Sequence, residues 1–182
     1  MQEALLFLTQ IQPPRNYKNI ESLNRVADYI KSRFEDLGIE VAYQDFVVSN
    51  HMYKNIIASI NPHHEKRLII GGHYDVCGDT QGADDNASAI AGLIQSAKPL
   101  KEIEKELNFR IDLVAFCLEE PPYFGTEHMG SYIHAKYLKE QKIPVIGMIN
   151  YEMIGYFTDE PNSQNYPVED MKNILSISDT LP

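Results

Sequence analysis

Apolar and polar positions alternate with two different periods along the first 155 residues. Between residues 19 and 37 apolar side chains recur every three or four positions, which predicts a helix that starts after Asn19 and stops at Gly38. Two further helices are expected at 86–98, where Pro99 would end the helix, and at 127–140. Strands are predicted at 40–48, 53–60, 68–70, 111–118 and 145–151.

The order of these elements determines the expected fold class. Strands alternate with helices, which favours an α/β three-layer sandwich with helices on both faces of a mostly parallel or mixed sheet. The length of 182 residues suits one domain, spanning 1–182. The stretch after Gly155 is rich in Asp, Glu, Asn, Ser and Pro, and we expect one short helix there, near 168–177.

Acidic side chains and one histidine stand where predicted strands end. His73 follows the first buried strand, Glu119 and Glu120 follow the second, and Glu152 follows the third. Asp85 comes just before a predicted helix. Because ligands gather at the carboxyl ends of strands in open α/β sheets, these five side chains should meet at one edge.

Four carboxylates this close together would repel one another, and some would take up protons. A divalent cation resolves the repulsion, and one histidine with several carboxylates suits zinc, with manganese, cobalt or iron as alternatives. Of the neighbours Glu119 and Glu120, one can bind metal while the other accepts a proton from water. Asp75 is close enough to His73 to orient its ring, and Asp84 is expected to cap the helix that follows.

Composition and charge narrow the classes of partner. Lys and Arg total 16 against 26 Asp and Glu, a net charge of −10, which argues against nucleic acid or an anionic membrane as the main partner. Two cysteines are too few for a disulfide framework; Cys117 should be buried and Cys77 should lie in a loop. The first residues have no features of a signal peptide, so we expect a cytoplasmic protein.

Four segments, taken together and in this order, carry a family resemblance. The chain resembles the co-catalytic zinc aminopeptidases of the bacterial leucyl aminopeptidase type, whose relatives include glutaminyl cyclases and which have a phosphorylase/hydrolase-like fold. The segments are Gly71-Gly72-His73-Tyr74-Asp75, Gly82-Ala83-Asp84-Asp85-Asn86-Ala87-Ser88, Glu119-Glu120 and Ile149-Asn150-Tyr151-Glu152-Met153-Ile154-Gly155.

The resemblance implies a role for each candidate residue. His73 and Glu152 would bind one zinc ion, Glu120 would bind a second, and Asp85 would bridge the two. Glu119 would be the general base and Asp75 would orient His73. The implied reaction is hydrolysis of the first peptide bond of a substrate with a free amino terminus.

One zinc ligand of the family has no counterpart in this chain. The family takes a last histidine from a C-terminal unit, and no histidine follows His134. His63 and His64 are predicted to lie in a polar turn, and His128 and His134 on a solvated helix face. We therefore expect a chain that lacks the C-terminal strands and holds one complete zinc site, while the full-length protein holds two.

Three functions remain open at this point. The first is a zinc aminopeptidase as the full-length protein. The second is a non-catalytic or truncated binding and assembly module, in which an exposed sheet edge favours self-association. The third is a glutaminyl cyclase-like acyltransferase.

Overall fold

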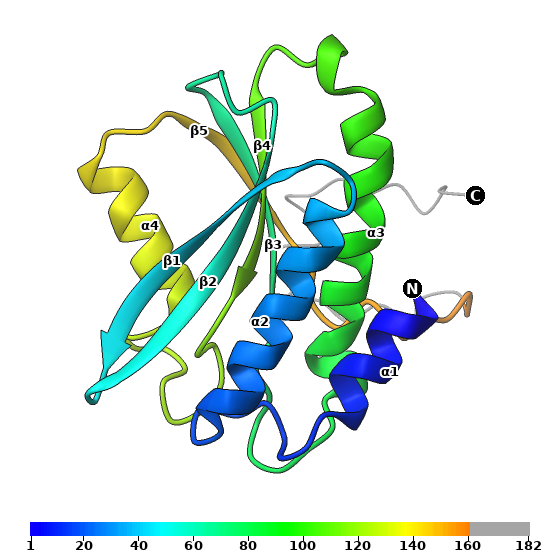
Figure 1. Cartoon of the computed structure of the whole chain (residues 1–182), viewed down its shortest axis with the longest axis vertical. Coiled ribbons are helices and arrows are strands. Elements are labelled where there is room, and N and C mark those ends of the chain that lie inside the picture. The colour runs from blue at the N-terminus through cyan, green and yellow to red at the C-terminus, as the bar shows by residue number, and fades with distance from the viewer. Residues whose placement is uncertain (161–182) are drawn as a thin grey trace.

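The computed structural model describes residues 1–160 (Figure 1). The helical elements are α1 (Gln2–Gln10), α2 (Ile20–Glu35), the π-helical turn η1 (Ala83–Ser88), α3 (Ala89–Glu102), the short η2 (Glu104–Glu106) and α4 (Gly130–Glu140). The strands are β1 (Glu40–Val48), β2 (His51–Ile60), β3 (Arg67–His73), β4 (Arg110–Phe116) and β5 (Val145–Asn150). The predicted helix near 168–177 lies outside the described residues.

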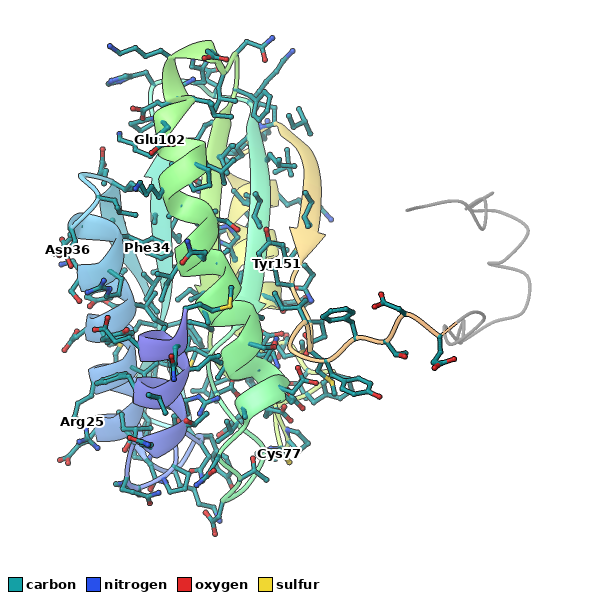
Figure 2. The ribbon with its side chains drawn as sticks, turned by 90° about the vertical axis from the view of Figure 1, so that its right-hand side faces the viewer. Arg25, Phe34, Asp36, Cys77, Glu102 and Tyr151 are labelled. Carbon is teal, nitrogen blue, oxygen red and sulfur yellow. The ribbon has the colours of Figure 1, made fainter. Side chains whose placement is uncertain are left out.

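The strands form one mixed sheet in the order β1-β2-β4-β3-β5. β2 is antiparallel to both β1 and β4, whereas β3 is parallel to both β4 and β5. Helices α1, α2 and α3 cover one face, and α4 lies on the other (Figures 1 and 2). This three-layer α/β arrangement confirms the predicted fold class.

The central strand β4 is buried on both faces, which explains its nearly continuous apolar sequence. Leu113 belongs to the large core beneath α2 and α3, together with the fully buried Phe34 of α2 and Leu93 of α3. The next residue, Val114, points to the opposite face and packs with Leu138 of α4 in a smaller cluster. Consecutive β4 residues therefore hold the two helical layers against one sheet.

Several predicted boundaries hold and others move. Asn19 directly precedes α2, and Gly38 adopts the left-handed conformation with φ of 68° that glycine favours where a helix stops. Pro99 does not end α3, which continues to Glu102 with Pro99 inside it, because the Pro99 carbonyl still accepts the amide of Ile103. The predicted helix at 127–140 begins later, at Gly130.

Strand β5 forms one edge of the described sheet. Four of its six residues have large apolar side chains that are 42–54% exposed, namely Val145, Ile146, Met148 and Ile149.

Among residues 1–160, none of the helices is both long enough and apolar enough to cross a membrane.

Candidate metal centre

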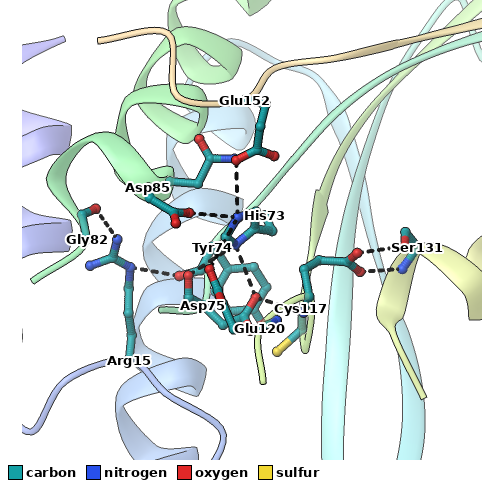
Figure 3. A network of polar contacts seen from close by, with 12 residues as sticks. Arg15, His73, Tyr74, Asp75, Gly82, Asp85, Cys117, Glu120, Ser131 and Glu152 are labelled. Atoms are coloured by element: carbon teal, nitrogen blue, oxygen red, sulfur yellow. Dashed lines mark hydrogen bonds and ion pairs between the residues drawn. The ribbon is translucent and has the colours of Figure 1, made fainter. Parts of the chain in front are cut away.

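Three parallel strands deliver polar side chains to the same edge of the sheet (Figure 3). His73 is the last residue of β3, Glu119 and Glu120 follow β4, and Glu152 follows β5. Asp85 reaches this edge from the turn η1. All five side chains that were predicted to meet at one edge of the sheet therefore lie there, in one group or directly beside it.

His73 lies at the centre of this group. Its Nε2 atom lies 3.2 Å from Asp85 Oδ1, 3.6 Å from Glu152 Oε1 and 4.0 Å from Glu120 Oε1. One ligand atom each from His73, Asp85 and Glu120 lie within 4.8 Å of one another, and within residues 1–160 this is the one such group of three. Glu152 lies at the rim, with a side chain that is 47% exposed. The tightest trio therefore contains Glu120, whereas the resemblance pairs His73 with Glu152.

The position of Asp85 depends on an irregular turn. Gly82, which precedes η1, has φ of 56°, a conformation that favours glycine. Asp85 itself has non-helical angles inside the turn, with φ of −101° and ψ of 95°. Its Oδ1 atom is buried and has no hydrogen-bond partner in the described part of the chain. His73 Nε2 lies 3.2 Å away without forming a hydrogen bond to this oxygen. A buried carboxylate oxygen without a hydrogen bond is unusual, and a cation beside His73 and Glu120 would satisfy it.

The donor set fits a divalent cation. One imidazole nitrogen with two or three carboxylates is a ligand set that zinc accepts, and manganese and other first-row metals accept it too. His73, Asp85 and Glu120 would hold the ion most directly, with Glu152 within reach of the same imidazole.

Asp75 is buried and organises the backbone around the group. Its Oδ1 and Oδ2 atoms accept the backbone amides of Glu119 and Glu120, at 3.2 and 3.1 Å. Its Oδ1 also lies 3.4 Å from Nδ1 of His73. The preceding residue of the turn, Leu118, has φ of 63°, a strained conformation for a leucine. Asp75 thus stands where it can orient His73 and also hold a strained turn.

Glu119 faces the beginning of α4. Its Oε1 accepts the backbone amide of Ser131 and its Oε2 accepts the Ser131 hydroxyl, both at 2.7 Å (Figure 3). Burial raises the pKa of Glu119 above its usual range, and these two bonds oppose part of the rise. Sequence reasoning did not single out Ser131, since a serine at a helix start carries no signal for a partner twelve residues away.

Neighbouring charges for His73, and mainly burial for Glu120, raise the pKa values of these two candidate ligands. Burial alone would lower the pKa of His73, but its bond to Asp75 and the nearby Glu152 and Asp85 carboxylates outweigh this and raise the pKa to about 9. Burial, reinforced by repulsion from Asp85, raises the pKa of Glu120 to about 7. Without a metal, His73 is therefore a cation at neutral pH.

A cavity of about 960 Å³ opens beside the group. Its lining includes His73, Asp85, Glu119 and Glu120. Large side chains with apolar surface also line it, namely Phe116, Phe124, Met129, Tyr132 and Met148. The cavity therefore offers a ligand both acidic groups and apolar surface.

Two predicted assignments near the site are wrong, and a third is right only in part. Asp84 does not cap α3; its Oδ1 instead accepts the Gly155 amide at 2.9 Å and so ties η1 to the segment after β5. His134 is buried at 3% exposure because the face of α4 that carries it packs on the sheet. His128 is exposed, as predicted, but precedes α4.

Comparison with known proteins identifies the family. The chain has a three-layer α/β fold with an acidic, histidine-containing group of side chains at the carboxyl edge of its parallel strands. Residues 55–178 match the sequence profile of peptidase family M28. The chain belongs to this family, which confirms the resemblance found in its motifs.

The chain is similar to individual proteins over parts of their length. The chain is 42% identical over 175 residues to the uncharacterized protein YfbL of Escherichia coli, an alignment that covers 92% of this chain and 53% of YfbL. It is 29% identical over 112 residues to aminopeptidase YwaD of Bacillus subtilis, covering 59% of this chain and 23% of YwaD. The LapA aminopeptidase of Legionella pneumophila has the same fold, with a TM-score of 0.74 at 20% identity, covering 96% of this chain and 49% of LapA.

The chain thus spans about half the length of YfbL and of LapA, and less of YwaD.

Proposed function

We propose that the full-length protein is a metal-dependent aminopeptidase, with zinc as the metal. The observation that carries the proposal is the convergence of His73, Asp85 and Glu120 within 4.8 Å, beside a separate half-buried carboxylate, Glu119, that lines the same cavity. Membership of peptidase family M28 and the similarity to an aminopeptidase support it. The full-length site would hold two ions, the second needing a further ligand.

Each residue has a distinct part in the proposed reaction. His73, Asp85, Glu120 and Glu152 hold the metal, which when bound polarises a substrate carbonyl and acidifies water. Glu119 accepts a proton from the attacking water and delivers it to the leaving amine. Its raised pKa suits a group that must both accept and release a proton near neutral pH. The acidic cluster attracts the protonated amino terminus of a peptide.

The test compares Glu119→Gln with the parent in the full-length, zinc-loaded protein. We expect the parent to release chromophore from aminoacyl p-nitroanilides but not from their N-acetylated forms. Glu119→Gln should lower kcat by a factor on the order of 100 or more, with an unchanged zinc content. Glu140→Gln, an exposed substitution at the end of α4, is the matched control and should retain full activity.

Other results identify the other candidate functions. Cyclisation of an N-terminal glutamine without hydrolysis would indicate a glutaminyl cyclase-like acyltransferase. Zinc binding with no turnover of any unblocked substrate would indicate a non-catalytic module. Equal activity of Glu119→Gln and the parent would refute the role of Glu119.

A further inference from the structure

Arg15 is a fully buried cation in the segment between α1 and α2, 1% exposed. Its guanidinium donates to four backbone carbonyls. Nε donates to Tyr74 O and Nη2 to Gly82 O, both at 2.7 Å (Figure 3). Nη1 donates to Leu8 O and Gln81 O at 2.6 Å each. One side chain thereby joins the end of α1, the end of β3 and the start of η1.

These contacts fix both ends of the loop that leads to Asp85. Tyr74 directly follows β3, and Gln81 and Gly82 directly precede η1. The backbone of Arg15 also takes part, because its carbonyl accepts the Val76 amide at 3.2 Å. The loop is therefore attached to Arg15 at its beginning and at its end.

The packing around Gly82 leaves little freedom for the loop to move. A Cβ atom added at Gly82 would lie 2.3 Å from the Asp85 carbonyl oxygen, 2.3 Å from Val76 Cγ1 and 2.9 Å from Arg15 Nη2. Gly82 is therefore packed tightly between the Arg15 guanidinium and the backbone of Asp85, with no room for a side chain. A displacement of the Arg15 contacts would be transmitted to Asp85.

The contacts of the Arg15 guanidinium are suited to holding the backbone of the loop in place rather than to pairing with an opposite charge. Within residues 1–160, Arg15 has no carboxylate oxygen within 4.0 Å, so its charge is met by carbonyl dipoles. Burying a charge in this way costs stability unless its hydrogen bonds are complete. A planar fork of donors can serve several carbonyls at fixed angles, which a lysine ammonium cannot do.

We propose that Arg15 is a positioning residue for the metal centre, acting through Asp85. By fixing the loop from Tyr74 to Gly82, it holds Asp85 Oδ1 3.2 Å from Nε2 of His73, ready to share a cation. This inference rests on the proposed metal centre, and it assigns a role in metal affinity to a side chain that touches no ligand atom.

The experiment measures zinc affinity by competition with a chromophoric chelator, using the 182-residue chain. Arg15→Lys keeps the charge but cannot reproduce the four bonds, and we expect its affinity to fall about 10- to 100-fold, as when partners of metal ligands are lost. Ile60→Ala is the matched control, since Ile60 is fully buried at the opposite end of the sheet. Its affinity should stay within about twofold of the parent, because cavity formation there lowers stability without moving the loop.

A double-mutant cycle tests whether Arg15 acts through Asp85. In the Asp85→Asn background, Arg15→Lys should lower the residual affinity by less than about threefold, because the two changes remove the same interaction. Full additivity of the two losses would overturn the proposal, as would an Arg15→Lys affinity within twofold of the parent.

Two further outcomes are decisive. If the parent chain binds no zinc, the metal centre itself fails, and the inference fails with it. Arg15→Lys is first checked for a cooperative thermal transition. If it does not fold, Gly82→Ala takes its place, because it displaces the same loop while Arg15 remains. An affinity loss of about tenfold or more for Gly82→Ala supports the proposal, and parental affinity overturns it.

Discussion

Zinc binding to this chain should release more protons than zinc binding to a histidine and a glutamate with ordinary pKa values would. A metal ligand must be deprotonated, so the metal competes with any proton that a ligand carries. The pKa of His73 is raised to about 9 by Asp75, Glu152 and Asp85 despite its burial, and the pKa of Glu120 is raised to about 7 mainly by burial. Both groups therefore carry protons at pH 6.

The expected number follows from these two pKa values. At pH 6, His73 is fully protonated and Glu120 is about nine-tenths protonated, so binding should release about two protons. With ordinary values of about 6.5 and 4.3, the same two ligands would release about 0.8. Zinc affinity should accordingly rise about 100-fold per pH unit below pH 7, and about tenfold per unit between pH 7 and pH 9.

Isothermal titration calorimetry in several buffers of different ionisation enthalpy measures the released protons directly. Measurement at pH 6 limits the contribution from water that the metal acidifies, since that water ionises near pH 7. Glu120→Gln should lower the release at pH 6 from about two to about one, because one titrating ligand is removed. A release of about one proton or fewer by the parent chain would refute the reasoning about the cluster.

Two further predictions concern stability. Burial, opposed by Asp112, lowers the pKa of His134 to about 4; because the unfolded histidine takes up a proton near pH 6.5, the free energy of unfolding should fall as pH drops from about 6.5 to about 4, by about 3 kcal/mol in total. Urea unfolding should show this slope flattened in His134→Gln, and an equal slope in both proteins would contradict it. Gly130→Ala should destabilise the fold by about 1–3 kcal/mol, because its Cβ would lie 2.2 Å from Asn55 Oδ1. Gly147→Ala, whose nearest neighbour would be 3.5 Å away, is the control, and equal melting temperatures for the two variants would contradict the steric argument.

The sheet and the ends of its strands could be predicted because both follow from local patterns. Short apolar runs mark buried strands, and the carboxyl ends of parallel strands share an edge. His73, Glu120 and Glu152 each follow such a run, so their convergence required no knowledge of long-range contacts. In the parallel pair of β3 and β4, His73 lies opposite Phe116. This register sets where His73 stands along the strands relative to Glu120, which follows β4.

The errors arose where a local pattern has two physical solutions. His134 was predicted to face solvent because polar side chains usually lie on the exposed face of a helix. In the fold it bonds Gln44 of β1 through Nδ1, at 3.1 Å, beneath α4. Asp84 has the composition of a helix cap, but the turn η1 directs it toward Gly155 instead. Neither partner is close in sequence.

The positioning groups could not be predicted, because what they bind has no signature in the sequence. Arg15 donates to carbonyls 59, 66 and 67 residues away, and any residue type supplies a carbonyl. Metal ligands, by contrast, are limited to a few side chains, so a sequence displays them. Sequence reasoning is therefore best at finding the atoms that touch a ligand and weakest at finding the atoms that hold them in place.

This difference also bears on how the chain combines stability with chemistry. Asp85 and Glu120 repel each other, and one buried oxygen of Asp85 forms no hydrogen bond in the described part of the chain, so these side chains weaken the metal-free fold. Arg15 and Asp75 are buried and bonded almost entirely to backbone atoms, at both sides of the cluster. Their bonds hold the backbone in place whether or not a cation is present. In the proposed metal centre the acidic edge would therefore be in place before a cation binds, and binding would relieve a repulsion that the fold already sustains.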